Sequence, residues 1–206
     1  MERKNENQKK YIVIAAALLL VFGITVSYAW LRISVGPAQR INKIKAGTIE
    51  LRLDETTTDG INLIKEVPKS YTQGYTDEHK YTFTLVNTGT TSSNYTITLN
   101  DLANYDNGTT LTPITAANRL NDNLIRVMVL KNGEAAAPEK SRLLSLDPGR
   151  VLDTGVIPAN ITRDSMIEYS VYVWIDSEAG DNGREANVMN KLFSGYLTVD
   201  AIQTHN

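Results

Sequence analysis

A run of 21 residues without a charged side chain, from Tyr11 to Leu31, divides this 206-residue chain into two unequal parts. As a helix, such a run is about 30 Å long, which matches the apolar core of a bilayer. The ten residues before it carry more basic than acidic side chains, so we expect this end to stay in the cytoplasm and the rest to be exported. The predicted divisions are a basic segment (1–10), a signal peptide or anchor (11–31), a linker or strand (32–43) and a β domain (44–206).

The uncharged segment has two interpretations. Ser27 and Ala29 are small residues three and one before a potential cut, a pattern typical of a secretory signal cleaved between Ala29 and Trp30. Tyr28 and Trp30 would instead suit the interfacial belt of a retained transmembrane helix. The small-residue pattern favours cleavage and an extracellular or cell-surface protein; the alternative is a domain anchored in the membrane.

Composition limits how the exported part is stabilised and what it binds. The chain has no cysteine, so the domain has no disulfides and must be held by a buried core. Its formal net charge of −2 argues against nucleic acid as a partner.

Alternation of apolar and polar residues predicts an all-β domain. It is clearest in residues 166–176, and two further alternating segments, 79–86 and 95–101, flank the polar turn "NTGTTSSN" and should be antiparallel neighbours. The sequence leaves no room for the crossover helices of a parallel sheet, so we expect an antiparallel jelly-roll or Ig-like β-sandwich. In "VMNKLF" we expect a helical turn that ends at Gly195, before a last strand from residue 196 to residue 202. The core residues that we expect between two sheets are Phe83, Leu85, Ile97, Val129, Val171 and Val173.

No catalytic motif of a hydrolase or nucleotide-binding enzyme occurs, so we predict a protein that is not an enzyme and has no cofactor. One acidic loop contains five oxygen-bearing side chains that could converge on calcium: Asp176, Glu178, Asp181, Asn182 and Glu185. The spacing does not match an EF-hand loop, and we favour a solvated hairpin loop without metal. The tyrosines and Trp174 could form a surface for carbohydrate, but aromatic residues at strand period more often pack in a core.

Four features together resemble the TasA/camelysin family of exported proteins of Gram-positive bacteria. They are the long signal running into "YAWLRISV", the strand ending in "FTLVNTG", the segment "LDPGRVLDTGVIPANITRDSMIEYSVYVWID", and a closing strand after an acidic, Asn-containing loop. The resemblance implies a jelly-roll domain, export through a dedicated signal peptidase, and assembly into fibres of the biofilm matrix by passing a strand into the next subunit. Some members are labelled metalloproteases, but no residue set here supports that chemistry.

The stretch "WLRISV" is the candidate for that donor strand. Leu31, Ile33 and Val35 share one face at strand period, and Gly36-Pro37 ends the stretch. Exposed to water, these apolar side chains would be unfavourable, whereas the edge of a neighbouring subunit would bury them. We therefore predict a structural fibre subunit that associates with copies of itself or related surface subunits; the alternative is a membrane-tethered β domain that binds a ligand or partner.

Overall fold

The structure is a computed structural model. It describes residues 30–35, 42–46, 49–55, 61–64, 66–76, 80–87, 89–106, 109–159, 166–177 and 188–203, with only the backbone in the first three ranges. None of the helices in these ranges has the length and apolarity to cross a bilayer, and residues 11–29 lie outside them.

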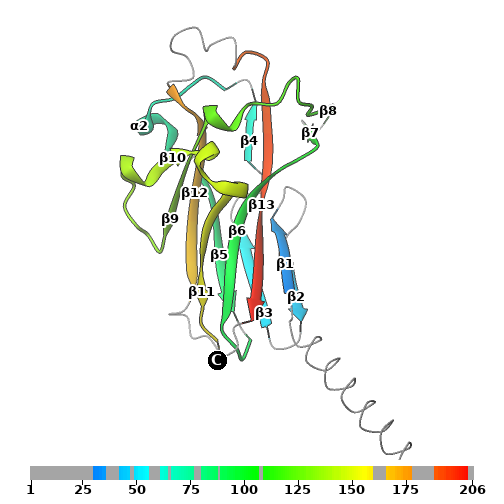
Figure 1. The fold of residues 1–206 in the computed structure, drawn as a ribbon, viewed down its shortest axis with the longest axis vertical. Coiled ribbons are helices and arrows are strands. Elements are labelled where there is room, and N and C mark those ends of the chain that lie inside the picture. The colour runs from blue at the N-terminus through cyan, green and yellow to red at the C-terminus, as the bar shows by residue number, and fades with distance from the viewer. Residues whose placement is uncertain are drawn as a thin grey trace, which may run out of the picture.

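Two antiparallel sheets form the body of the molecule (Figure 1), which confirms the all-β prediction. Sheet A has the order β1-β13-β6-β11, with β4 also paired to β13. Its strands are β1 (Trp30–Val35), β4 (Ile61–Ile64), β6 (Ser93–Asp101), β11 (Val151–Ile157) and β13 (Leu192–Gln203). Sheet B has the order β10-β9-β12-β5-β3-β2. Its strands are β2 (Asn42–Ala46), β3 (Ile49–Glu55), β5 (Lys80–Asn87), β9 (Ile125–Lys131), β10 (Ser141–Leu143) and β12 (Ile167–Ile175).

Short elements connect these strands. A small hairpin pairs β7 with β8, and the described helices are single turns. Their bounds are β7 (Asn104–Asp106), β8 (Leu111–Pro113), α2 (Tyr71–Gly74), η2 (Asp122–Leu124), η3 (Pro138–Lys140), η4 (Leu144–Leu146) and η5 (Pro148–Arg150).

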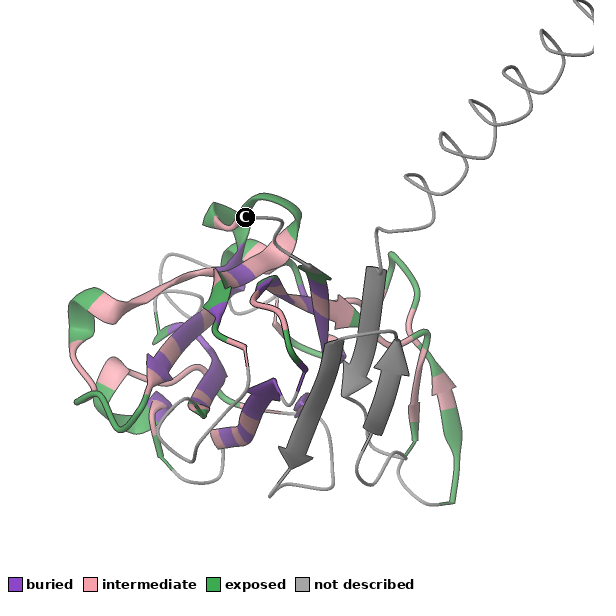
Figure 2. Ribbon diagram, turned by 90° about the horizontal axis from the view of Figure 1, so that it is seen from below, coloured by how far each residue is buried: buried purple, intermediate pink, exposed green. Residues whose placement is uncertain are grey.

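One apolar core lies between the two sheets. It joins inward-facing residues of β6 and β13 to those of β5, β9 and β12, and buried and partly buried residues alternate along several of these strands (Figure 2). Five of the six predicted core residues are fully buried there: Phe83, Leu85, Ile97, Val171 and Val173. Val129 is half-buried and packs against the core.

β5 and β6 are not neighbours, so that sequence prediction was wrong. β5 pairs with β12 and β3 in sheet B, whereas β6 pairs with β13 and β11 in sheet A. The turn between them crosses from one sheet to the other around Asn87, which is fully buried. The Asn87 side chain accepts a hydrogen bond from the Gly89 N–H and donates one to the Thr91 carbonyl, both at 2.9 Å. A buried side chain that satisfies the turn's backbone thus allows this crossing.

The outer face of β12 is also buried at its C-terminal end. There Trp174 and Tyr172 form a second apolar cluster, against which Tyr71 and Tyr75 of the α2 region pack. Gly74 allows this close approach, because a Cβ at this position would lie 2.3 Å from the Trp174 ring. Trp174 is fully buried, so it is not part of an exposed carbohydrate-binding surface.

β13 begins earlier than predicted. The turn at residues 188–190 is followed by a strand from Leu192 that continues through Gly195, so Gly195 does not end a helix. A Cβ at Gly195 would lie 2.9 Å from the Asn100 carbonyl oxygen and from the Phe193 ring. Glycine at this position therefore permits close contact with neighbouring atoms inside the strand. In the sequence alone, such a glycine cannot be told from one that ends a helix.

The core assignment predicts the effect of truncation. Phe83→Ala should lower the free energy of unfolding by about 3–5 kcal/mol, because it removes a buried ring and leaves a cavity. Urea denaturation measures this loss, and Val67→Ala, at an exposed apolar residue, is the control with little expected effect. Equal unfolding midpoints for Phe83→Ala and the unchanged protein would contradict the core assignment.

Candidate functional site

The candidate donor strand is β1, at an edge of sheet A. It pairs antiparallel with β13 of the same chain, from Trp30 opposite Ile202 to Val35 opposite Leu197. Leu31, Ile33 and Val35 stand opposite Ala201, Val199 and Leu197, three fully buried core residues. The predicted apolar positions of β1 therefore lie in the rows of sheet A that face the core.

β1 and β4 pair with the same edge of β13. In β4, residues Ile61–Ile64 pair with Gly195–Leu192. β1 pairs with residues 197–202, so the two strands lie end to end on the same side of β13. Without β1, residues 197–202 of β13 would have an open edge, a slot six residues long that is bounded at one end by β4.

The predicted cleavage site adjoins this strand. Ala29 lies outside the described residues, and Trp30 is the first residue of β1. A cut between them would make the N-terminus of the mature chain coincide with the start of the edge strand.

Of the five candidate calcium ligands, only Asp176 lies within the described residues. Asp176 is buried, with an exposed fraction of 5%, and its side chain accepts a hydrogen bond from Arg126 Nη2 at 2.9 Å. Glu178, Asp181, Asn182 and Glu185 lie outside the described residues, and within the described ranges no group of three His, Cys, Asp or Glu side chains could hold a metal. Asp176 thus has a structural partner, an ion pair that connects β9 to the end of β12.

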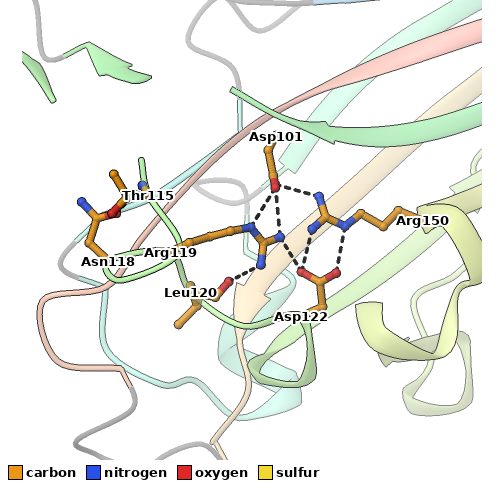
Figure 3. A network of polar contacts seen from close by, with 7 residues as sticks. All are labelled: Asp101, Thr115, Asn118, Arg119, Leu120, Asp122 and Arg150. Atoms are coloured by element: carbon orange, nitrogen blue, oxygen red, sulfur yellow. Dashed lines mark hydrogen bonds and ion pairs between the residues drawn. The ribbon is translucent and has the colours of Figure 1, made fainter. Parts of the chain in front are cut away.

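A second polar group is a closed network of two arginines and two aspartates (Figure 3). Arg119 contacts Asp101 at 2.7 Å and Asp122 at 2.6 Å, and Arg150 contacts the same two carboxylates at 2.7 and 2.8 Å. The network joins the end of β6 to the connection around η2 and to η5. Because each carboxylate is shared by two guanidinium groups, neither is available as a general base.

The network shifts the pKa of Asp101. Burial alone would raise the pKa of Asp101, but hydrogen bonds from Arg119 and Arg150 outweigh it and hold this pKa below its ordinary value. Arg150 also has a φ of 56°, a left-handed conformation that is unfavourable for a residue with a Cβ. Its contacts with both aspartates help to hold that conformation.

A third group connects the two sheets through the core. The hydroxyls of Tyr95 and Tyr169 are 2.6 Å apart, Tyr169 Oη donates to Asp153 at 2.5 Å, and Lys131 Nζ lies 2.7 Å from the same carboxylate. Tyr95 and Asp153 belong to sheet A, and Tyr169 and Lys131 to sheet B. Burial, with the hydrogen bond to Asp153, raises the pKa of the Tyr169 hydroxyl, so it stays protonated and donates.

In this third group, Lys131 and Asp153 form an ion pair rather than a covalent amide bond. Amide formation between Lys131 and Asp153 would need a neutral amine and a protonated carboxyl. Burial disfavours the charged ammonium, but the hydrogen bond and charge of Asp153 outweigh it and raise the pKa of Lys131. The arrangement is therefore an ion pair that ties sheet A to sheet B.

No family model, curated protein or solved structure matches this chain. The resemblance to the TasA/camelysin family stays a prediction.

The depressed pKa of Asp101 predicts how stability responds to acid. The charged Asp101 contributes stability above the ordinary aspartate pKa of about 3.9, and this contribution is lost as pH falls through the lower folded-state pKa. Asp101→Asn should be less stable than the unchanged protein at pH 7 and should lose less stability between pH 7 and about pH 2.

Urea midpoints at several pH values measure this difference. Glu139→Gln, which neutralises an exposed carboxylate of the β9–β10 connection, is the control and should keep the full acid dependence. An identical loss of stability on acidification in Asp101→Asn and the unchanged protein would show that the network does not shift this group.

Proposed function

We propose that the chain is an exported structural subunit of the cell surface or extracellular matrix that assembles into fibres by exchange of β1. The observation that carries this proposal is the coincidence of three features in one strand. β1 lies at a sheet edge, it fills a slot of its own length beside β13, and it begins at the residue that follows the predicted cut.

The position of β1 makes exchange topologically simple. An interior strand such as β6 is held by neighbours on both sides, whereas within the described residues β1 pairs with β13 alone. Cleavage after Ala29 would leave β1 attached to its domain only through residue 36 and the chain that follows. Such a strand can leave its slot without threading through a loop.

Exchange restores the contacts that departure removes. A β1 strand from a second copy would meet the same β13 backbone and the same buried row of Leu197, Val199 and Ala201. The pairing energy is thus similar within and between copies, and protein concentration decides which form is populated. Head-to-tail exchange that does not close on itself gives an open filament.

We also propose a specific class for this all-β fold. Two antiparallel sheets around one core are compatible with the jelly-roll or Ig-like sandwich that we predict, and the resemblance to the TasA/camelysin family favours the jelly roll. The same resemblance supports export through a signal peptidase and a role in a biofilm matrix.

The alternative function is a membrane-tethered surface domain that binds a ligand or partner. It requires that residues 11–31 are retained, with β1 then permanently seated beside β13. N-terminal sequencing of the exported protein separates the two functions: a mature start at Trp30 favours the fibre subunit, and retention of Met1 favours the tether.

Ile33→Asp tests the donor role of β1. In protein that begins at Trp30, this change should abolish polymerisation, because it puts a carboxylate opposite the fully buried Val199 in either copy. The described core, which is contributed by β4 and later elements, should remain folded by circular dichroism.

Light scattering against protein concentration is the measurement. Val67→Asp introduces the same charge at an exposed apolar loop residue and should polymerise like the unchanged protein. If the unchanged protein that begins at Trp30 stays monomeric at high concentration, the fibre function is wrong.

A further inference from the structure

Three exposed apolar side chains gather at one end of the two sheets, and we call them the apolar rim: Val156, Met166 and Ile202, with exposed fractions of 57%, 37% and 45%. Val156 is near the end of β11, Ile202 is near the end of β13, and Met166 directly precedes β12. The short β5–β6 turn shows that both sheets end here, because the Asn87 side chain at the end of β5 lies 3.5 Å from the carbonyl of Ile157.

The start of β1 belongs to the same end. Trp30 is opposite Ile202, Ile202 is opposite Asn94, and Asn94 is opposite Val156, so these four positions form one row across sheet A. With strands about 4.8 Å apart, Ile202 is about 5 Å from the Trp30 backbone and Val156 about 15 Å from it.

The chain itself brings this end toward a bilayer. The uncharged run from Tyr11 to Leu31 includes the first two residues of β1, so the sequence has no spacer between a membrane-inserted segment and sheet A. Interfacial Trp30 would then hold Ile202 and Val156 at the depth of the lipid headgroups.

We infer that in the uncleaved chain the apolar rim rests on the lipid surface, which holds the domain upright on the membrane until the signal peptidase cuts. Such a patch is too small for strong binding by itself, but the covalent tether gives it a high local lipid concentration. The next row of the sheet pairs Arg32 with Asp200, charges of opposite sign, so the contact does not depend on anionic lipid.

Exposed apolar residues at the opposite end provide a matched control. Met189 has an exposed fraction of 67% and precedes β13, a strand of 12 residues that ends beside the rim. Twelve residues span about 40 Å, so Met189 stays clear of the headgroups in an upright domain.

The absence of cysteine makes a site-specific test direct. Val156→Cys and Met189→Cys are introduced separately into the full 206-residue chain and labelled with the fluorophore NBD. Each protein is reconstituted into phosphatidylcholine vesicles, with and without lipid that carries a nitroxide at the headgroup. Thermal melts by circular dichroism establish that both labelled chains are folded.

We expect the nitroxide to quench the label at residue 156 at least threefold more than the label at residue 189, with a blue-shifted emission at residue 156 alone, and with no loss in 0.5 M salt. Equal quenching at both positions would show a domain that lies flat or points freely, and would overturn the inference. A chain that fails to float with the vesicles would overturn it as well. Neither result bears on fibre formation, which is measured on protein that begins at Trp30.

Discussion

The pairing along β13 is the constraint on which the rest of the structure depends. On one side β13 pairs with β6 from Gly195 to Gln203, and on the other it is divided between β4 and β1. Its inward residues Phe193, Leu197 and Val199 are fully buried in the common core. Any loss of β1 therefore exposes one edge of a central strand without dismantling the pairing with β6, which is the condition that strand exchange requires.

Polar contacts, rather than disulfides, fix the connections around this core. The network of Asp101, Arg119, Asp122 and Arg150 holds the segments that follow β6 and precede β11, and the ion pair of Lys131 with Asp153 ties one sheet to the other. These contacts are partly exposed, so each contributes modestly to stability, but together they limit how the connections move. A domain stabilised in this way keeps its body intact while an edge strand is replaced.

Periodicity predicted the strands well because it reports which side chains face the core. It placed Phe83, Leu85, Ile97, Val171 and Val173 correctly, and it identified the apolar positions 31, 33 and 35 of β1. It failed for the partners of β5 and β6, since a turn sequence does not reveal whether the chain returns to the same sheet or crosses to the other. Periodicity also did not reveal the α2 segment that covers Trp174, because that packing joins residues about a hundred positions apart.

Sequence periodicity does not predict the charged network or the tyrosine pair. Arg119 precedes η2 and Arg150 ends η5, and only the folded chain brings them to the same two aspartates. Gly155 was a possible clue to the tyrosine pair, since a Cβ there would lie 2.5 Å from Tyr95 Oη, but one glycine in a strand does not name its neighbour.

A reversible lock on β1 tests the exchange of this strand most directly. Arg32 and Asp200 are opposite each other, and opposite residues of antiparallel strands are within the Cα range that a disulfide spans. Arg32→Cys with Asp200→Cys should therefore tie β1 to its own β13. Thr96→Cys with Thr154→Cys, in the same row of sheet A, ties β6 to β11 and leaves β1 free as the control.

Light scattering of both proteins, beginning at Trp30, is then compared with and without dithiothreitol. The account predicts that the β1 lock stays monomeric when oxidised and polymerises when reduced, while the control polymerises in both states. Polymerisation of the oxidised β1 lock, at the rate of the control, would contradict strand exchange as the means of assembly.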